Sequence, residues 1–407
     1  MTMKPKGSFI ILLGGLMAAT TASAVPVAPV AGNLYVLEHG DYNVSYNNPK
    51  ILAITPTGAV SVAVSADDIK AVTGESSVHF NDNGLAFDNA GNLYFTDSYS
   101  DAVLKLSAGG SLSVVASETA MESDTGLIDV DPLGIAVGSD GMLYVNEADN
   151  DSILKVNPIT GATQVFKTEA ELISGTGLSD VDVDRGIVAS ANGKLLLSTD
   201  RDGDDPNAVY SIDLTSGAIS LLTQDQSNSL PNYSPSSTID ELHDFMTLAP
   251  NGDVIISAED PADAILRITP GGTVTTFLDE AAIESLLSVA DVEMVAGLAF
   301  DALGNFYLAD EENDHILKWV VDDLAAGTID PNSVSIFLSE SDAKSALGVS
   351  SIDYESGIAF APFVEAVPEP AALGLLGIAL AGMGFGKRRY LGLTRDVGSA
   401  DQGSSGQ

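Results

Sequence analysis

The sequence has no cysteine, and it has little positive charge. Without cysteine, disulfides, thiol nucleophiles, Cys-ligated zinc and iron–sulfur clusters are all excluded. The 17 Lys and Arg residues stand against 57 Asp and Glu, which gives a net charge of -40. A field of that sign repels nucleic acid and anionic membrane surfaces, so we expect neither as a partner. G-x-S-x-G, H-E-x-x-H and P-loop motifs are also missing.

Long apolar runs are restricted to the two ends of the chain. Near the N-terminus, Lys4 and Lys6 precede an apolar run over residues 9–19 and then Ala22-Ser23-Ala24. A charged segment, a short apolar segment and an A-x-A site predict a secretory signal peptide over residues 1–24. Signal peptidase is the partner expected at that step.

The C-terminal end has a short acidic motif, an apolar segment over residues 371–385 and a basic cluster. The residues of the motif and the cluster are Val367, Pro368, Glu369, Pro370, Lys387, Arg388 and Arg389. An apolar helix that ends in cations predicts a membrane stop with the cations on the cytoplasmic side. The segment is short for a full span, which fits a transient anchor. The polar tail, residues 390–407, is predicted to be disordered.

The order of these three parts resembles the PEP-CTERM sorting signal, which we assign to residues 365–389. The resemblance implies recognition by an exosortase and removal of the helix. It also implies export across the inner membrane and delivery to the outer surface or exopolysaccharide matrix of a Gram-negative bacterium.

The body of the chain repeats one unit. Three segments share the same order of features: residues 84–106, 134–156 and 297–319. Each begins with an apolar run and continues with a turn whose glycine lies seven residues after the first residue of the segment. A second apolar run, an acidic residue that ends it, and a third apolar run follow. Each unit continues into a fourth apolar run. Alternating apolar residues with Gly-containing turns predict four strands, here named a to d in chain order. Recurrence every 50 to 60 residues is typical of a radial β-array.

Five complete units begin at Gly84, Gly134, Gly186, Phe245 and Gly297. A sixth is split between the two ends. Residues 32–35 match the start of strand b, and residues 357–360 supply the missing strand a. Pairing the last strand with the first closes the ring and protects its edges. We therefore predict an all-β fold, a six-bladed β-propeller of four-stranded blades over residues 25–364.

Short helices are expected between blades, at residues 66–72, 168–173, 279–287 and 339–347. Acidic residues near their starts favour helix N-termini. We expect these helices to cover one face of the disc.

The repeated sequence G-[IL]-A-x-x-x-x-G-x-[LF]-Y-[VFL] resembles NHL repeats and the gluconolactonase, regucalcin and strictosidine-synthase-like propellers. The resemblance covers residues 25–364 and implies the fold. It does not imply one function, because such propellers include binding modules and hydrolases.

Acidic residues gather just before strand a of most units, where they are expected to ring one mouth of the central channel. The metal candidates among them are Asp129, Asp131, Asp182, Asp184, Asp240, Asp244, Glu293 and Asp353. Converging carboxylates repel unless protons or cations intervene, and oxygen ligands favour Ca²⁺. A Ca²⁺ site and a hydrated acidic mouth both remain open as interpretations.

Two further acidic groups are present. Asp200, Asp202 and Asp204 alternate with other residues around Gly203 and partly match a Ca²⁺ loop, and an acidic turn is the other interpretation. A carboxylate also ends strand b in every unit: Glu38, Asp97, Glu147, Asp200, Glu259 and Asp310. Three of them are followed four residues later by Asp, at Asp101, Asp151 and Asp314. Because a catalytic site is needed only once, this repetition predicts that they accept turn N–H bonds.

The sequence predicts an exported binding or scaffold module that takes Ca²⁺ or a small ligand at its acidic mouth. The alternative is a metal-dependent lactone or ester hydrolase, which the gluconolactonase resemblance implies. For that enzyme Glu38 is the expected metal-ligand candidate, although the E-G-P context is replaced by Glu38-His39-Gly40. No catalytic residue is assigned.

Overall fold

The structure is a computed structural model, and it describes a single unit of the chain. The described residues are 25–40, 48–80, 83–178, 180–183, 186–199, 207–224, 241–259, 264–294, 296–354 and 356–363. They belong to the compact unit Met1–Val364, which is separate from Glu365–Gln407. The predicted signal peptide, sorting segment and tail lie outside the described residues.

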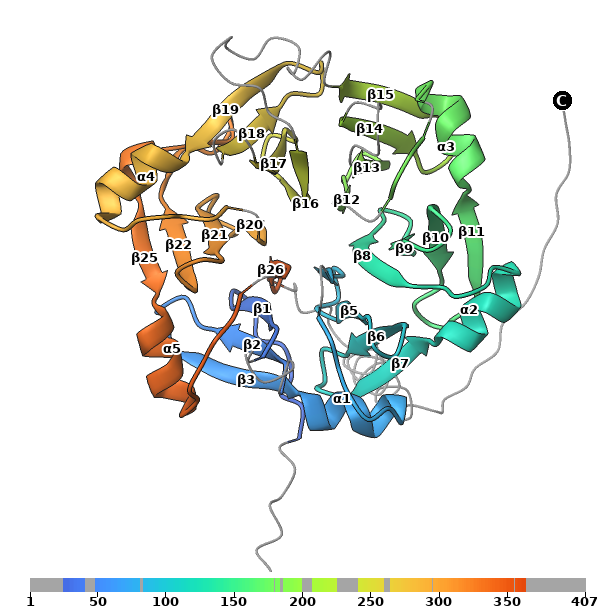
Figure 1. The fold of residues 1–407 in the computed structure, drawn as a ribbon, viewed down its shortest axis with the longest axis horizontal. Helices are drawn as coiled ribbons and strands as arrows, with labels where there is room; N and C mark the ends of the chain where they lie inside the picture. Colours follow the sequence, from blue (N-terminus) through green and yellow to red (C-terminus); the bar gives the residue numbers. More distant parts are fainter. Residues whose placement is uncertain are drawn as a thin grey trace, which may run out of the picture. The chain divides into compact units, whose positions relative to one another are not determined.

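Six four-stranded antiparallel sheets are arranged around a common axis in the described part of the chain (Figure 1). The first blade contains β26 (Ile358–Phe360), β1 (Leu34–Glu38), β2 (Lys50–Ile54) and β3 (Val60–Ser65). The second contains β4 (Leu85–Phe87), β5 (Leu93–Asp97), β6 (Ala102–Leu106) and β7 (Leu112–Ala116). The third contains β8 (Pro132–Val137), β9 (Leu143–Glu147), β10 (Ser152–Val156) and β11 (Thr163–Lys167).

The other three blades follow the same order from the axis outwards. The fourth contains β12 (Ile187–Ala189), β13 (Lys194–Thr199), β14 (Ala208–Asp213) and β15 (Ile219–Gln224). The fifth contains β16 (Glu241–Leu248), β17 (Val254–Glu259), β18 (Ala264–Ile268) and β19 (Val274–Asp279). The sixth contains β20 (Leu298–Phe300), β21 (Phe306–Asp310), β22 (His315–Trp319) and β25 (Ser335–Leu338), with the β23 (Val321–Asp323) and β24 (Thr328–Ile329) hairpin inserted before β25.

The ring closes within the first blade, as predicted. β26, from the C-terminal end of the propeller, pairs antiparallel with β1, and the register places Leu34 opposite Phe360 and Val36 opposite Ile358. The predicted six-bladed propeller with a split blade is therefore confirmed.

The turn between strands a and b explains part of the repeated sequence. In the second blade, Asp88 Oδ1 accepts the N–H groups of Ala90 and Asn92, each at 2.9 Å. Gly91 in the same turn has φ of 80°, a conformation that favours glycine. Asp301 accepts the equivalent N–H groups of Leu303 and Asn305 in the sixth blade. The repeated Asp, Gly and Asn thus build one turn in two distant blades.

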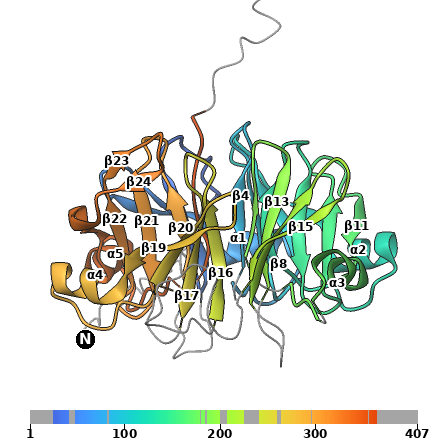
Figure 2. The ribbon, with the colours of Figure 1, turned by 90° about the horizontal axis from the view of Figure 1, so that it is seen from above.

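Five short helices connect strand d of one blade with strand a of the next. They are α1 (Ala66–Thr73), α2 (Glu118–Thr125), α3 (Glu169–Thr176), α4 (Glu280–Leu287) and α5 (Glu340–Leu347). Their N-caps are Ser, Thr or Asp side chains, and each ends in a left-handed residue. The helices lie around the outer rim (Figure 1) and towards one face of the disc (Figure 2). Four were predicted, and α2 was not.

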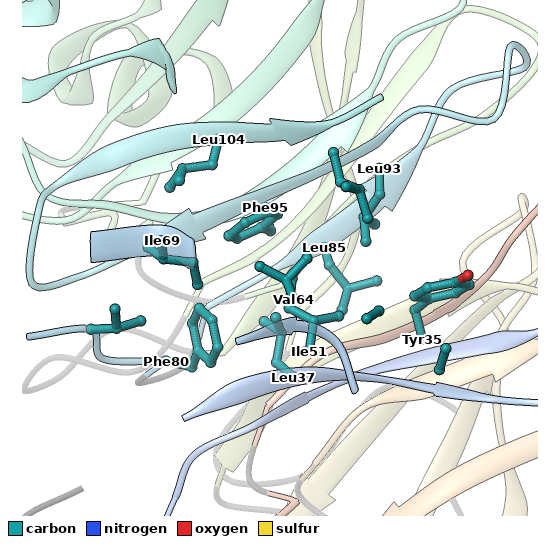
Figure 3. Close-up of a cluster of buried hydrophobic side chains, with 14 of the residues drawn as sticks. Tyr35, Leu37, Ile51, Val64, Ile69, Phe80, Leu85, Leu93, Phe95 and Leu104 are labelled. Atoms are coloured by element: carbon teal, nitrogen blue, oxygen red, sulfur yellow. The ribbon is translucent and has the colours of Figure 1, made fainter. Parts of the chain in front are cut away.

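The core lies between the blades. Six clusters of buried apolar side chains each join two neighbouring blades. Figure 3 shows the cluster between the first and second blades, where Tyr35 and Leu37 of β1 meet Phe80, Leu93 and Phe95. Burial of such aliphatic and aromatic side chains contributes roughly 1.5–3 kcal/mol each. The blades thus pack against one another without disulfide bonds.

At the centre, the innermost strands approach one another backbone to backbone. Gly84 N–H donates to Leu133 O at 3.1 Å, and Gly357 N–H donates to Asn83 O at 3.3 Å. The cavity that remains on the axis is about 60 Å³. Its described lining is glycine and apolar residues, among them Leu85, Ile135 and Leu298. At this level of the channel, the described lining residues offer no side-chain oxygen or nitrogen ligand for a metal.

Candidate functional site

The carboxylates at the ends of the b strands accept hydrogen bonds from residues of their own blades. Asp97 Oδ1 accepts His79 N–H at 2.8 Å, and Asp97 Oδ2 accepts the Ser100 hydroxyl at 2.6 Å. Glu147 accepts Asp131 N–H at 3.3 Å in the same way. Each is fully buried and ties the segment that precedes strand a to strand b of the same blade. Asp310 repeats the arrangement in the sixth blade through Glu293 N–H at 3.2 Å. These contacts give the carboxylates the structural role expected from their repetition.

Burial acts strongly on these carboxylates. It raises the pKa of Asp97 and Glu147, and the hydrogen bonds that they accept act in the opposite direction. It raises the pKa of Asp310 to about 6. The side chains of Asp200 and Glu259 lie outside the described part of the chain.

Glu38 forms a buried ion pair with Lys50. The two residues are opposite each other in the β1–β2 register, and Lys50 Nζ lies 2.5 Å from Glu38 Oε2. The Glu38 side chain is 0% exposed and the Lys50 side chain 9%. Burial raises the pKa of Glu38 even though Lys50 acts to lower it. The residue proposed as the metal ligand of a lactonase is therefore already neutralised by a neighbour on the next strand.

The predicted metal candidates occupy different places. Asp131, Asp182, Glu293 and Asp353 are half-buried in the segments that lead into strand a. Asp353 O accepts His39 N–H and Glu293 O accepts Glu311 N–H, each at 3.2 Å, so these two positions are equivalent. The side chain of Asp244 lies outside the described part of the chain. Five other candidates fall outside the described residues altogether: Asp184, Asp200, Asp202, Asp204 and Asp240.

Asp129 is separated from Asp131 and lies beside α2. Its N–H donates to Glu122 Oε1 at 3.0 Å. Within the described residues, Glu118, Glu122 and Asp129 are the one group of three possible metal ligands whose oxygen atoms all lie within 4.8 Å of one another. The carboxylate of Asp129 is exposed to solvent. Of the two acidic residues before the third blade, Asp129 thus lies at the outer rim and Asp131 at the blade junction.

The aspartates that directly precede strand c have partners that the sequence did not reveal. Asp101, Asp151 and Asp314 have φ of 43°, 44° and 50°. Asp151 accepts the N–H of Val183, and Asp314 accepts the N–H of Tyr354. Both donors belong to the segment that enters the next blade. Each aspartate therefore faces across a blade junction rather than closing its own turn.

These junctions bring carboxylates of three segments together. Burial raises the pKa of Asp101 to about 7, and the charges of Asp131 and Glu118 add most to this effect. The pKa of Asp151 rises to about 6 through burial, Asp182 and Glu169. Burial, Asp353 and Glu340 raise the pKa of Asp314 to about 8. The glutamate in each group is the first residue of the inter-blade helix. We call these groups the junction clusters, and the face that carries them the acidic face.

The junction clusters predict an unusual pH dependence. The folded-state pKa values of Asp314, Asp101 and Asp151 lie above the value of 3.8 for a free Asp. The folded state therefore binds more protons than the unfolded state, and the free energy of unfolding should fall as pH rises between about 5 and 8. Urea unfolding in EDTA at several pH values measures this slope. The double variant Asp101→Asn/Asp314→Asn should flatten it, and a stability that rises over this window would contradict the assignment.

A separate cavity lies on the opposite face, where the a–b turns are located. It has a volume of about 300 Å³ between the first and sixth blades, and Phe300, Leu303, Tyr307 and Phe360 are among its lining residues. Its lining is mainly apolar. The two faces of the disc therefore differ in chemistry, one acidic and one with an apolar hollow.

Comparison with known proteins identifies one short motif. The PEP-CTERM protein-sorting motif matches residues 366–389. No curated protein matches the chain. A chain of a nidogen/laminin complex is similar at 17% identity and a TM-score of 0.49, covering 81% of this chain and 98% of that one.

Two bacterial structures are also similar. A gluconolactonase from Xanthomonas campestris shares 15% identity, with 66% of this chain and 82% of that chain covered and a TM-score of 0.43. The calcium-binding protein regucalcin from Agrobacterium tumefaciens shares 15%, with 69% and 91% covered and a TM-score of 0.39. These likenesses concern the fold alone.

Membrane contact was expected from the apolar segment at residues 371–385, which lies outside the described residues. No helix among the described residues is both long and apolar enough to span a bilayer. The chain is thus a six-bladed β-propeller, similar in fold to gluconolactonase and regucalcin structures, that carries the PEP-CTERM protein-sorting motif at residues 366–389.

Proposed function

We propose that this protein is an exported binding and scaffold module of the cell surface or exopolysaccharide matrix, and that its acidic face binds Ca²⁺. The observation that carries the proposal is the set of junction clusters. Three aspartates from three different blades have pKa values raised first by burial and then by the charges of other carboxylates. Close carboxylates need protons or cations between them, and outside the cell calcium is available for that role.

The sorting motif supports the location. PEP-CTERM motifs imply processing by an exosortase, so signal peptidase and exosortase are the expected partners during export. The net charge of -40 suits a surface that gathers cations in a polysaccharide matrix. A propeller held together by apolar clusters between blades is a rigid platform for such binding.

The lactone or ester hydrolase is the weaker alternative. Its expected metal ligand, Glu38, is paired with Lys50, and the described lining of the central cavity is glycine and apolar. A metal on the axis therefore finds no support in these residues. A lactone and ester hydrolysis screen of the purified protein with Ca²⁺, Mg²⁺ or Mn²⁺ should stay at background, and turnover would restore this alternative.

Thermal unfolding with and without Ca²⁺ tests the proposed function. Ca²⁺ that binds only the folded state adds RT ln(1 + [Ca²⁺]/Kd), about 2.7 kcal/mol at a concentration 100-fold above Kd. The melting temperature of the protein should therefore rise by a few degrees in millimolar CaCl₂ compared with NaCl of equal ionic strength. An unchanged melting temperature would remove calcium from the proposal.

A further inference from the structure

The apolar hollow between the first and sixth blades has the composition of a small-molecule site. Its volume is about 300 Å³, and the aromatic residues of its lining are Phe300, Tyr307, Phe360 and Phe363. Tyr307 and Phe360 come from the two different blades, and their rings meet edge to face with centroids 4.8 Å apart. Phe363 is 69% exposed, so its ring is open to solvent. Ligand pockets are typically concave and lined by apolar and aromatic side chains with few polar groups, as this hollow is.

The β23–β24 hairpin supports the turn that lines this hollow. It lies on the face of the a–b turns, away from the inter-blade helices (Figure 2). Val321 N–H of the hairpin donates to Asn305 Oδ1 of the sixth-blade turn at 3.1 Å. Asn251 Nδ2 and Arg267 Nη2 of the fifth blade each donate to Ala326 O in the hairpin at 2.8 Å. The turn beside the hollow is therefore held in place by contacts from two blades.

Asp301 places a carboxylate in the lining, and no ion pair neutralises it within the described residues. Its oxygen atoms accept uncharged donors, among them the Tyr307 hydroxyl at 3.3 Å. In the third blade, Asp140 accepts the corresponding tyrosine hydroxyl and lies 2.7 Å from Lys155 Nζ. Lys318 holds the register position of Lys155 in the sixth blade, but its Nζ lies over the Tyr307 ring, 5.0 Å from the centroid. The hollow thus combines aromatic rings with a carboxylate that lacks an ion-pair partner.

We propose that this hollow binds a small organic cation with an apolar body, such as a quaternary ammonium that carries an aromatic ring. Aromatic rings attract a cation through their faces, and Asp301 supplies an opposite charge. A bare metal ion fits poorly, because Ca²⁺ takes about six to eight oxygen ligands and the described lining has a single carboxylate. An anion would meet Asp301 and a protein net charge of -40. The site is separate from the acidic face, so the inference goes beyond the proposed function.

Calorimetric titration of the full chain in EDTA, with benzyltrimethylammonium as the probe, tests the charge of the ligand. Benzyl alcohol and benzoate carry the same ring without charge and with a negative charge. We expect one saturable site for the ammonium, binding of the alcohol that is at least tenfold weaker, and no binding of benzoate. Equal affinities for the ammonium and the alcohol would overturn the assignment of a cation. EDTA keeps Ca²⁺ out of the measurement, so the result does not depend on the proposed function.

Two variants locate the bound ammonium. Leu303 lines the hollow and is 70% exposed, so Leu303→Lys adds a positive charge at the rim and should weaken binding at least tenfold. Leu303→Gln is the matched uncharged control and should weaken binding much less. Phe363→Ala removes the exposed ring and should weaken binding about tenfold. Ile159→Ala, at a residue 89% exposed in the third blade, should match the parent protein.

The same variants separate the hollow from other acidic parts of the surface. Because their side chains are exposed, the substituted proteins should melt within a few degrees of the parent, so a loss of binding reports on the site and not on folding. Unchanged affinity of the ammonium for both Leu303→Lys and Phe363→Ala would mean that it binds elsewhere, which would overturn the site. A parent protein without saturable binding of the ammonium would also overturn it, and either result would leave Ca²⁺ binding by the acidic face standing.

Discussion

Replacing Gly297 by alanine should lower the free energy of unfolding by about 3 kcal/mol, because overpacking against a rigid backbone cannot be relieved by side-chain movement. A Cβ atom on Gly297 would lie 2.6 Å from Ile358 N and 2.8 Å from Ser356 O. Both atoms belong to the innermost segment of the neighbouring blade. Chemical denaturation of the purified variant measures the loss.

Gly109→Ala is the matched control for this prediction. The nearest atom to a Cβ at Gly109 is Ser107 Oγ at 3.8 Å, so the change should stay within about 0.5 kcal/mol. Gly84→Ala, which places a Cβ 2.7 Å from Ile135 N, should behave like Gly297→Ala. Equal stability of the Gly297 and Gly109 variants would show that close approach of the inner strands does not determine how the blades assemble.

Replacing Lys50 by methionine should cost about 3 kcal/mol at neutral pH, since it leaves a buried carboxylate without its partner. Glu38 is 0% exposed and lies 2.5 Å from Lys50 Nζ. In the variant, Glu38 must be ionised without compensation or take up a proton, and its pKa is already raised by burial. The loss should therefore shrink as pH falls, and urea unfolding at about pH 5 and pH 8 measures the difference.

Two variants control the prediction for Lys50. Glu38→Gln/Lys50→Met removes both charges and should recover most of the lost stability, because a buried pair adds little net free energy over neutral residues. Lys194→Met breaks the ion pair of Lys194 with Asp213, in which the lysine side chain is 41% exposed and the aspartate side chain 31%, so it should cost much less than Lys50→Met. A double variant as unstable as Lys50→Met would mean that packing of the lysine stem, and not charge, is responsible.

The repeat itself made the fold predictable from the sequence. Glycine-bearing turns and alternating apolar residues placed the third apolar run, strand c, at the end of residues 84–106 and 134–156, which agrees with β6 and β10. The match of residues 32–35 to a strand b start revealed how the ring closes. Helix α2 was missed because only Met121 of its eight residues is buried, so its apolar periodicity is weak. Its signals were the Ser117 cap and the Gly126 end.

The candidate site was predictable only in part. The acidic residues before strand a were found as a pattern, but the partners of Asp314 come from positions 26 and 39 residues further along the chain. Their meeting depends on how consecutive blades are rotated about the axis, and local sequence does not contain that rotation. The left-handed backbone of Asp314 directs its carboxylate to the next blade. The sequence signal that could have indicated these clusters is an aspartate directly before strand c combined with a glutamate as the first residue of the following inter-blade helix.

Calcium calorimetry of the purified protein in two buffers with different ionisation heats is the most direct test of the acidic face. Asp101 and Asp314, with pKa values of about 7 and about 8, are partly protonated near neutral pH. Ca²⁺ binding should therefore be saturable and should release protons, which makes the measured heat depend on the buffer. If calorimetry detects no binding up to millimolar Ca²⁺, or detects binding without proton release, the proposal that the acidic face binds Ca²⁺ is contradicted.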